Sequence, residues 1–223
     1  MKKTLTLIFI LILLFLFNCS KSNGGNDPYQ RKQAAKISQK DIEKLKEKVK
    51  KLPFTPVKPG EIGYIRTNYG MIKIKFFPDK APKTCANFKR LANSGFYNGT
   101  SFHRVVPNFV IQGGDILSRD KNRMNDGSGD PGFNIDAEIS DLIHERGSVA
   151  MARRGDDLNS ASSQFYICLR RLPGLDSQYT VFAKVIDGMD VVDTIAQVRR
   201  DGRDNPIERV EMFKVWVGMK KSK

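Results

Sequence analysis

Short runs of strand-forming residues, separated by Gly, Asn, Asp and Pro, fill the chain from Glu61 onward and constrain its fold most. The first two runs flank Asn68-Tyr69-Gly70 and are expected to form a hairpin. The expected strands cover residues 62–67, 71–77, 102–106, 109–112, 148–152, 164–169, 180–185 and 210–217. Because closing a sheet removes exposed edge strands, this pattern predicts an all-β-dominated, closed antiparallel barrel.

Two helix signals interrupt the strands. Residues 81–93 carry Pro82 in the first turn and close at Gly95, and residues 189–198 carry Val192 and Ile195 on one face. Because each helix is isolated among strands, both are expected to cap the ends of the barrel.

The first 18 residues are expected to be a lipoprotein signal peptide. Lys2 and Lys3 precede an apolar stretch, residues 4–17, that is too short for a transmembrane span. Cys19 follows in a context that resembles a lipobox, although Asn18 stands where a small residue is usual. The sequence predicts lipidation of Cys19 and a place on a membrane of the bacterial cell envelope, periplasmic or surface-exposed. The alternative is an ordinary secretory signal that leaves Cys19 as a free thiol.

A polar, Gly/Asn-rich segment, residues 19–36, is expected to be a flexible tether. Residues 37–60 are expected to form a short helix, with Ser38 as its N-cap, and a Pro-rich linker. The main domain is expected to cover residues 61–218, followed by a basic tail, residues 219–223.

The formal charge of +14 is distributed unevenly. Residues 1–59 hold 13 Lys/Arg and 4 Asp/Glu, whereas residues 60–223 hold 25 and 20. A nucleic-acid-binding domain usually carries its basic face on the folded part, so no nucleic-acid partner is expected. The basic N-terminal segment is instead expected to be solvated, with contact to anionic lipid as the second interpretation.

The sequence gives no sign of a cofactor or metal site. His103 and His144 are the only histidines, and they are far apart in the sequence, without clustered ligands around them. The Gly-rich stretch near Gly127 lacks the Lys-Ser/Thr of a phosphate-binding loop. Cys85 and Cys168 each lie in an apolar pattern, which favours two separate buried thiols over a disulfide, although the sequence leaves both open.

Residues 102–115, FHRVVPNFVIQGGD, resemble the signature of cyclophilins. Further segments match that family in the same order over residues 61–218, including 81–88, 147–152, 163–167 and 175–185. The resemblance implies an eight-stranded antiparallel barrel with two capping helices, acting as a monomeric peptidyl-prolyl cis-trans isomerase on proline-containing peptides.

Rotation about an X–Pro bond breaks amide resonance, with a barrier of ~18–20 kcal/mol for a peptide bond. No bond to carbon breaks, so neither a covalent intermediate nor a cofactor is required. A guanidinium can stabilise the twisted amide, whose nitrogen becomes a better hydrogen-bond acceptor.

By position in the signature, Arg104 corresponds to the donor to the prolyl nitrogen, Phe109 to the floor of the proline pocket, and Gln112 to the residue that orients the arginine and bonds substrate backbone. The resemblance also implies the substrate-binding residues Val110, Ala152, Arg153, Tyr166, Leu175 and Tyr179. For each of these alone, a purely structural role would be the simpler interpretation.

Several positions depart from the family pattern. Gly174 stands where many cyclosporin-sensitive members have Trp, which predicts weak cyclosporin binding. Tyr166 replaces the commoner Phe and is expected to add a hydroxyl at the pocket rim. Arg153-Arg154 replaces a small polar pair, which predicts a preference for acidic residues before the proline.

Two further functions remain open besides catalysis. A cyclophilin fold could grip proline-containing segments as a chaperone or adhesin, or the chain could be a structural envelope lipoprotein, since a fold alone does not define an activity. The presence of Arg104, Phe109 and Gln112 favours the enzyme.

Overall fold

The computed structural model describes residues 37–220 and contains three α-helices and eight β-strands. The expected signal peptide, Cys19, the tether and residues 221–223 lie outside the described residues. The helices are α1 (Gln39–Lys51), α2 (Pro82–Ser94) and α3 (Met189–Ala196). The strands are β1 (Glu61–Thr67), β2 (Gly70–Phe76), β3 (Arg104–Val106), β4 (Val110–Gly113), β5 (Ser148–Met151), β6 (Phe165–Cys168), β7 (Val181–Asp187) and β8 (Met212–Met219). None of the helices in this part of the chain is long and apolar enough to span a membrane.

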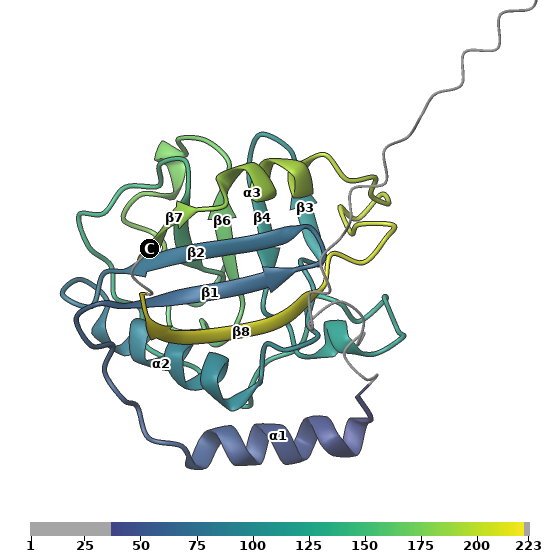
Figure 1. Ribbon diagram of the computed structural model, residues 1–223, viewed down its shortest axis with the longest axis horizontal. Helices are drawn as coiled ribbons and strands as arrows, with labels where there is room; N and C mark the ends of the chain where they lie inside the picture. The colour runs from purple at the N-terminus through teal and green to yellow at the C-terminus, as the bar shows by residue number, and fades with distance from the viewer. Residues whose placement is uncertain (1–36, 221–223) are drawn as a thin grey trace, which may run out of the picture. The chain divides into compact units, whose positions relative to one another are not determined.

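All eight strands form one curled antiparallel sheet in the order β3-β4-β6-β5-β7-β2-β1-β8 (Figure 1). The expectation of a closed barrel is corrected here, because the end strands β3 and β8 do not pair with each other. An isolated bridge between Ser101 and Glu211 spans the gap, flanked by the backbone bonds Met212 N–Thr100 O (2.7 Å) and Phe102 N–Val210 O (2.9 Å). Beyond this bridge, Val105 N of β3 bonds the Asp204 carbonyl (2.8 Å) and not a residue of β8, so the ladder does not continue along β3 and the sheet stays open.

The helix α2 begins and ends as its sequence predicts. Pro82 lies in the first turn, and Gly95 ends the helix at φ 84°, a conformation that favours glycine. Ala81 has no capping side chain. The Glu138 carboxylate replaces it by accepting the backbone N–H groups of Lys83 (2.9 Å) and Thr84 (2.7 Å).

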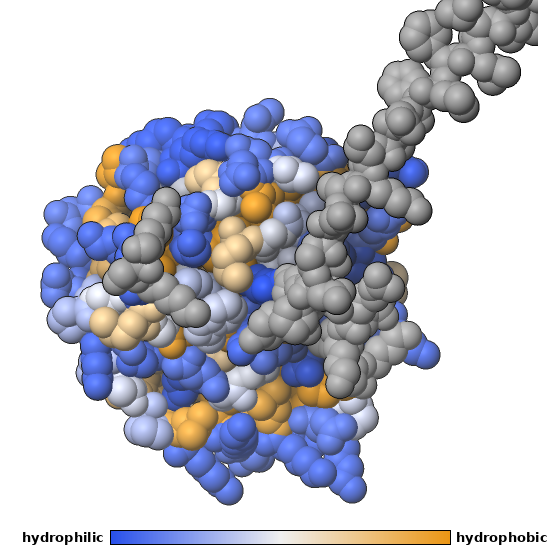
Figure 2. Space-filling view, viewed as in Figure 1, coloured by the Kyte–Doolittle hydropathy of each residue, from blue (hydrophilic) through white to orange (hydrophobic). Residues whose placement is uncertain are grey.

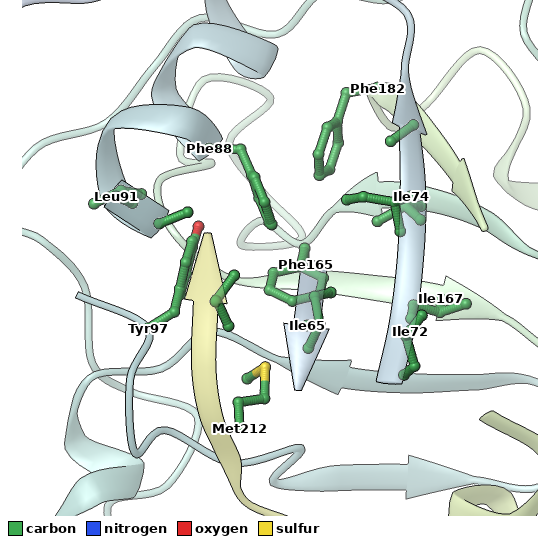
Figure 3. Close-up of a cluster of buried hydrophobic side chains, with 14 of the residues drawn as sticks. Ile65, Ile72, Ile74, Phe88, Leu91, Tyr97, Phe165, Ile167, Phe182 and Met212 are labelled. Atoms are coloured by element: carbon green, nitrogen blue, oxygen red, sulfur yellow. The ribbon is translucent and has the colours of Figure 1, made fainter. Parts of the chain in front are cut away.

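The main core lies between α2 and one face of the sheet, and aromatic rings dominate it. The Phe88 ring on α2 lies 5.4 Å from that of Phe165, 5.5 Å from Phe182 and 5.6 Å from Phe76, between centroids. Figure 3 shows Phe88 pointing from its helix toward the strands that carry Phe165 and Phe182. This packing anchors β7 and also β6, the strand that carries Tyr166.

A smaller apolar cluster lies apart from the main core and includes Val110, Ala150, Tyr166, Cys168, Leu172 and Val181. Alternation along each strand separates the two groups: on β6, Phe165 and Ile167 belong to the main core, whereas Tyr166 and Cys168 belong to the smaller cluster. Cys85 is in the main core, and both it and Cys168 are free thiols, in agreement with the favoured interpretation.

The N-terminal helix α1 packs on the rest of the described chain. Its cap is the expected one: the Ser38 hydroxyl accepts the backbone N–H of Asp41 (3.2 Å). Ile42 and Val49 are buried and belong to the main core. Figure 2 shows the outward edge of α1, at the bottom of the view, as hydrophilic, with hydrophobic residues between it and the sheet.

Candidate active site

A row of side chains crosses four neighbouring strands on the face away from the main core. The strand register aligns Arg104 of β3 with Gln112 of β4, Gln112 with Tyr166 of β6, and Tyr166 with Ala150 of β5. Residues aligned in register on adjacent strands share a face. The sheet therefore brings the arginine, the glutamine and the tyrosine together from segments up to 62 positions apart.

The turn between β3 and β4 places Phe109 beside this row. Pro107 and Asn108 occupy its centre, Asn108 has φ 57°, and Phe109 N–H bonds the carbonyl of Val106 at 3.0 Å. Proline followed by a residue with positive φ is the sequence of a type II turn. The short motif Pro-Asn thus sets the position of the aromatic ring that follows it.

A further part of the site comes from the segment after β6. The 3-10 helix η2 (Pro173–Leu175) supplies Leu175, and Tyr179 follows before β7. The Arg153 guanidinium lies over the Tyr179 ring, 4.5 Å from its centroid. This stacking holds the ring by cation–π attraction.

These elements enclose a pocket of about 180 Å³. It is lined by Arg104, Phe109, Val110, Gln112, Ala152, Arg153, Tyr166, Leu175 and Tyr179. The structure thus brings together all nine residues that the family resemblance selected for catalysis and substrate binding. Phe109 and Leu175 are half-buried, so the pocket offers apolar surface that is open to a ligand.

A chain of amide groups supports Arg104. Its Nη1 lies 3.4 Å from Gln112 Oε1, and Gln112 Nε2 donates to Gln164 Oε1 at 3.0 Å. Gln164 Nε2 in turn donates to the carbonyls of Gly127 (2.8 Å) and Gly129 (3.0 Å). The contacts orient the Gln112 amide with its oxygen toward the guanidinium.

Sequence reasoning missed the role of Gln164. The signal was present in SSQFYIC, because Gln164 stands two positions before Tyr166 and so shares its face. A polar residue directly before the buried strand β6 and on the same face as Tyr166 is placed to hydrogen-bond other polar groups there.

Asp115 holds the loop that carries these carbonyls. Its fully buried carboxylate accepts the backbone N–H groups of Leu117 (2.7 Å) and Gly127. Burial raises the pKa of Asp115, and these backbone bonds oppose that shift. A Cβ at Gly129 would lie 1.9 Å from Asp115 Oδ1, so the close approach of the loop requires glycine there.

A second cavity of about 360 Å³ adjoins the first and shares Gln112, Ala152 and Arg153 with it. Its other walls are polar and include Arg154, Ser162 and the 127–130 loop. The Arg153 guanidinium also donates to the carbonyls of Arg154 (2.8 Å) and Gly155 (3.0 Å). Arg154 is exposed, with only a loose contact of 3.7 Å to Asp157.

The sequence predicted the Tyr166 hydroxyl at the pocket rim, and the structure corrects this prediction. The hydroxyl lies 3.1 Å from Nε2 of His144, which is completely buried. The ring still lines the pocket, but its polar end is turned toward the protein interior because His144 offers a buried partner there.

No three His, Cys, Asp or Glu side chains within residues 37–220 are placed to hold a metal ion. The pocket instead presents a guanidinium, an amide and apolar walls. Such a site can hold a small apolar ring of a peptide while donating hydrogen bonds to its backbone.

A curled eight-stranded antiparallel sheet with this pocket on the face away from the main core is the architecture of the cyclophilin-like fold class. Residues 63–217 match the family described as cyclophilin type peptidyl-prolyl cis-trans isomerase. The chain belongs to this family and is a peptidyl-prolyl cis-trans isomerase.

Its relatives include proteins from organisms as different as a yeast and a bacterium. Peptidyl-prolyl cis-trans isomerase ppi1 of Schizosaccharomyces pombe is 38% identical over 150 residues, covering 67% of this chain and 94% of the relative. A peptidyl-prolyl cis-trans isomerase of Helicobacter pylori is 42% identical over 137 residues, covering 60% and 78%. A cyclophilin type isomerase of Cryptosporidium parvum, crystallised in the presence of the dipeptide Ala-Pro, superposes with a TM-score of 0.66 at 33% identity, covering 71% and 99%.

Proposed function

We propose that Arg104 accelerates X–Pro rotation by donating a hydrogen bond to the prolyl nitrogen as the amide twists, while the proline ring occupies the pocket around Phe109. The observation that carries this proposal is the single pocket that Arg104, Gln112 and Phe109 line together. A guanidinium presents several N–H donors in a planar fork, so it can stabilise the twisted amide by hydrogen bonding without proton transfer. Gln112, held by Gln164, keeps the guanidinium beside the ring.

The test is an isomerase assay on the full chain and on Arg104→Ala, with a tetrapeptide Ala-Ala-Pro-Phe as substrate. We expect kcat/KM to fall more than about tenfold, equivalent to about 1.4 kcal/mol of transition-state stabilisation. Tyr64→Phe, on β1 away from the pocket, serves as the control. A folded Arg104→Ala variant with unchanged kcat/KM would contradict the role of Arg104. A folded parent without activity would favour a module that only binds proline-containing segments.

The substrates that we propose are exported or envelope proteins, reached from a lipid anchor on Cys19. The apolar stretch before Cys19 and the polar segment after it support this proposal. Mass spectrometry of the membrane fraction should find a lipid on Cys19, and Cys19→Ser should release the protein from that fraction. Recovery of an unmodified Cys19 thiol would favour an ordinary secretory signal.

We also propose a preference for acidic residues before the proline. Arg154 supports it best, because its guanidinium is exposed beside the second cavity, whereas Arg153 is engaged with carbonyls and Tyr179. In a tetrapeptide series, Glu before the proline should give a higher kcat/KM than Ala, and Lys a lower one, with the difference shrinking at high salt. Equal values across the series would refute the preference.

A further inference from the structure

His144 is completely buried, and each of its polar groups has a hydrogen-bond partner. Its backbone N–H donates to Asp176 Oδ1 at 2.8 Å, and its carbonyl accepts from Leu172 N at 2.8 Å. Its ring nitrogens face two side chains: Nδ1 lies 3.1 Å from Asp176 Oδ1, and Nε2 lies 3.1 Å from the Tyr166 hydroxyl. A buried group this fully bonded is held in one orientation.

The partners define the direction of each bond. A contact with Arg171, and hydrogen bonds from His144, hold the pKa of Asp176 at about 2, so its carboxylate is ionised and only accepts. The Nδ1 of His144 must therefore be the donor. Burial lowers the pKa of His144, which leaves the ring neutral and Nε2 as an acceptor. The Tyr166 hydroxyl then donates to Nε2.

The two side-chain partners belong to different segments around the pocket. Tyr166 lines the pocket from β6, whereas Asp176 does not line it but directly follows the lining residue Leu175. The Tyr166 ring also lies edge-on to Tyr179, with centroids 6.0 Å apart. From inside the protein, His144 thus connects two segments that both contribute side chains to the pocket.

We propose that His144 is a positioning residue that fixes the width of the proline pocket by bonding Tyr166 and Asp176 at the same time. The inference rests on the proposed assignment of this pocket to the proline ring. It assigns His144 no contact with substrate. The bond from Tyr166 depends on the phenol, so it would be lost in a chain with Phe at this position.

A pocket of fixed width should discriminate between rings of different size. The probes are two tetrapeptides, one with proline and one with its six-membered homologue, pipecolic acid. We expect Tyr166→Phe, which keeps the ring and removes the bond, to lower kcat/KM for the proline peptide by about threefold to tenfold. The ratio of kcat/KM between proline and pipecolic peptides should fall as well, because a loosened pocket accepts the larger ring more easily.

If His144 acts through Tyr166, the effects of the two residues cannot add. The double variant His144→Gln/Tyr166→Phe should then be no worse than the more damaging single variant. Tyr64→Phe is the matched control, because it also removes a phenol hydrogen bond, to the Met219 carbonyl at 3.0 Å, far from the pocket. Tyr64→Phe should lower only the stability of the protein and leave the ratio of kcat/KM between the proline and pipecolic peptides unchanged.

Affinity for the same two peptides, measured by NMR titration of the full chain, gives the selectivity of the pocket without turnover. A parent that binds both peptides but isomerises neither would refute the proposed function, and the affinity ratio would still decide the role of His144. An unchanged ratio in Tyr166→Phe, additive losses in the double variant, or a parent that binds neither peptide would overturn the inference.

Discussion

Single residues in this site act mainly by holding other residues. Only Arg104 is proposed to touch the reacting amide, yet its position depends on Gln112, which depends on Gln164 and the glycine carbonyls beyond it. Each bond is modest in free energy, but leaving a buried amide unpaired costs more than the bond contributes. Substitutions behind the first row of side chains should therefore reduce activity without touching substrate.

Gly174 offers a residue-scale prediction about inhibition. A Cβ built there meets no atom within 4 Å, so the position accepts a large side chain. If the missing tryptophan accounts for weak cyclosporin binding, Gly174→Trp should strengthen inhibition by about tenfold or more, consistent with one added hydrogen bond and new apolar contact. The measurement is inhibition of peptide isomerisation by cyclosporin.

Gly202 provides the control, because a Cβ there is also unobstructed, and neither Gly202 nor its chain neighbours line the pocket, whereas Gly174 directly precedes the lining residue Leu175. Gly202→Trp should leave inhibition unchanged. Nanomolar inhibition of the parent would show that the tryptophan is not needed.

Among the elements, α1 and its linker lie outside the family match yet are firmly attached to α2. The Arg90 guanidinium lies over the Phe54 ring, 3.7 Å from its centroid, and over Phe133 at 4.4 Å. It also donates to the Leu52 carbonyl at 3.2 Å. Lys89 donates to the Pro56 carbonyl of the linker at 3.0 Å and forms a largely buried ion pair with Glu61, at the start of β1, at 2.6 Å. Two neighbouring residues of α2 thus hold the linker.

Arg90→Ala should therefore loosen α1 more than it affects the sheet. Losing both ring contacts and the bond to the linker should lower the free energy of unfolding by about 1–3 kcal/mol. Limited proteolysis should cut within residues 37–58 first, while isomerase activity stays near the parent level. Lys48→Ala, on the exposed face of α1, is the control. Equal protection of the linker in both variants would contradict the role of Arg90.

The elements were predictable from the sequence to within about two residues, because alternation, Pro82 and Gly95 are local signals. Likewise, the nine pocket residues followed from a motif resemblance. The residues that hold the pocket side chains in place were not predictable in this way. His144 is hydrogen-bonded to Tyr166, 22 positions away in the sequence, and Gln164 to Gly127, 37 positions away. Whether the sheet closes into a barrel was not predictable either, because Val105 of β3 bonds the Asp204 carbonyl and not β8, and this contact joins residues far apart in the sequence.

At the scale of the whole molecule, burial of His103 links stability to pH. Burial lowers the pKa of His103 from 6.5 to about 4, while Asp126 partly opposes the shift. Below pH 6.5 the unfolded chain binds a proton that the folded chain does not bind, so the His103 contribution to the unfolding free energy should fall as pH decreases from 6.5 to about 4 and then level off. The loss due to His103 should approach about 3 kcal/mol. Below about pH 4, the lowered pKa of Asp176 should reduce the unfolding free energy further.

Denaturant unfolding across this pH range measures the effect. His103→Leu should flatten the dependence, leaving the smaller contribution of His144, whose lowered pKa acts in the same direction. If the unfolding free energy depends on pH with the same slope in the parent and in His103→Leu, another group governs stability in acid.

The pairing of β1 with β8 determines when the enzyme can first exist during synthesis. The first strand, β1, can pair only after β8, the last strand, has been made. The strand β3, which carries Arg104, also needs a late segment, because Val105 N bonds the Asp204 carbonyl at 2.8 Å. A nascent chain cannot complete either contact until its final segment has emerged. The chain therefore stays incompletely folded during synthesis, and it can begin to isomerise prolines only after its last residues have left the ribosome.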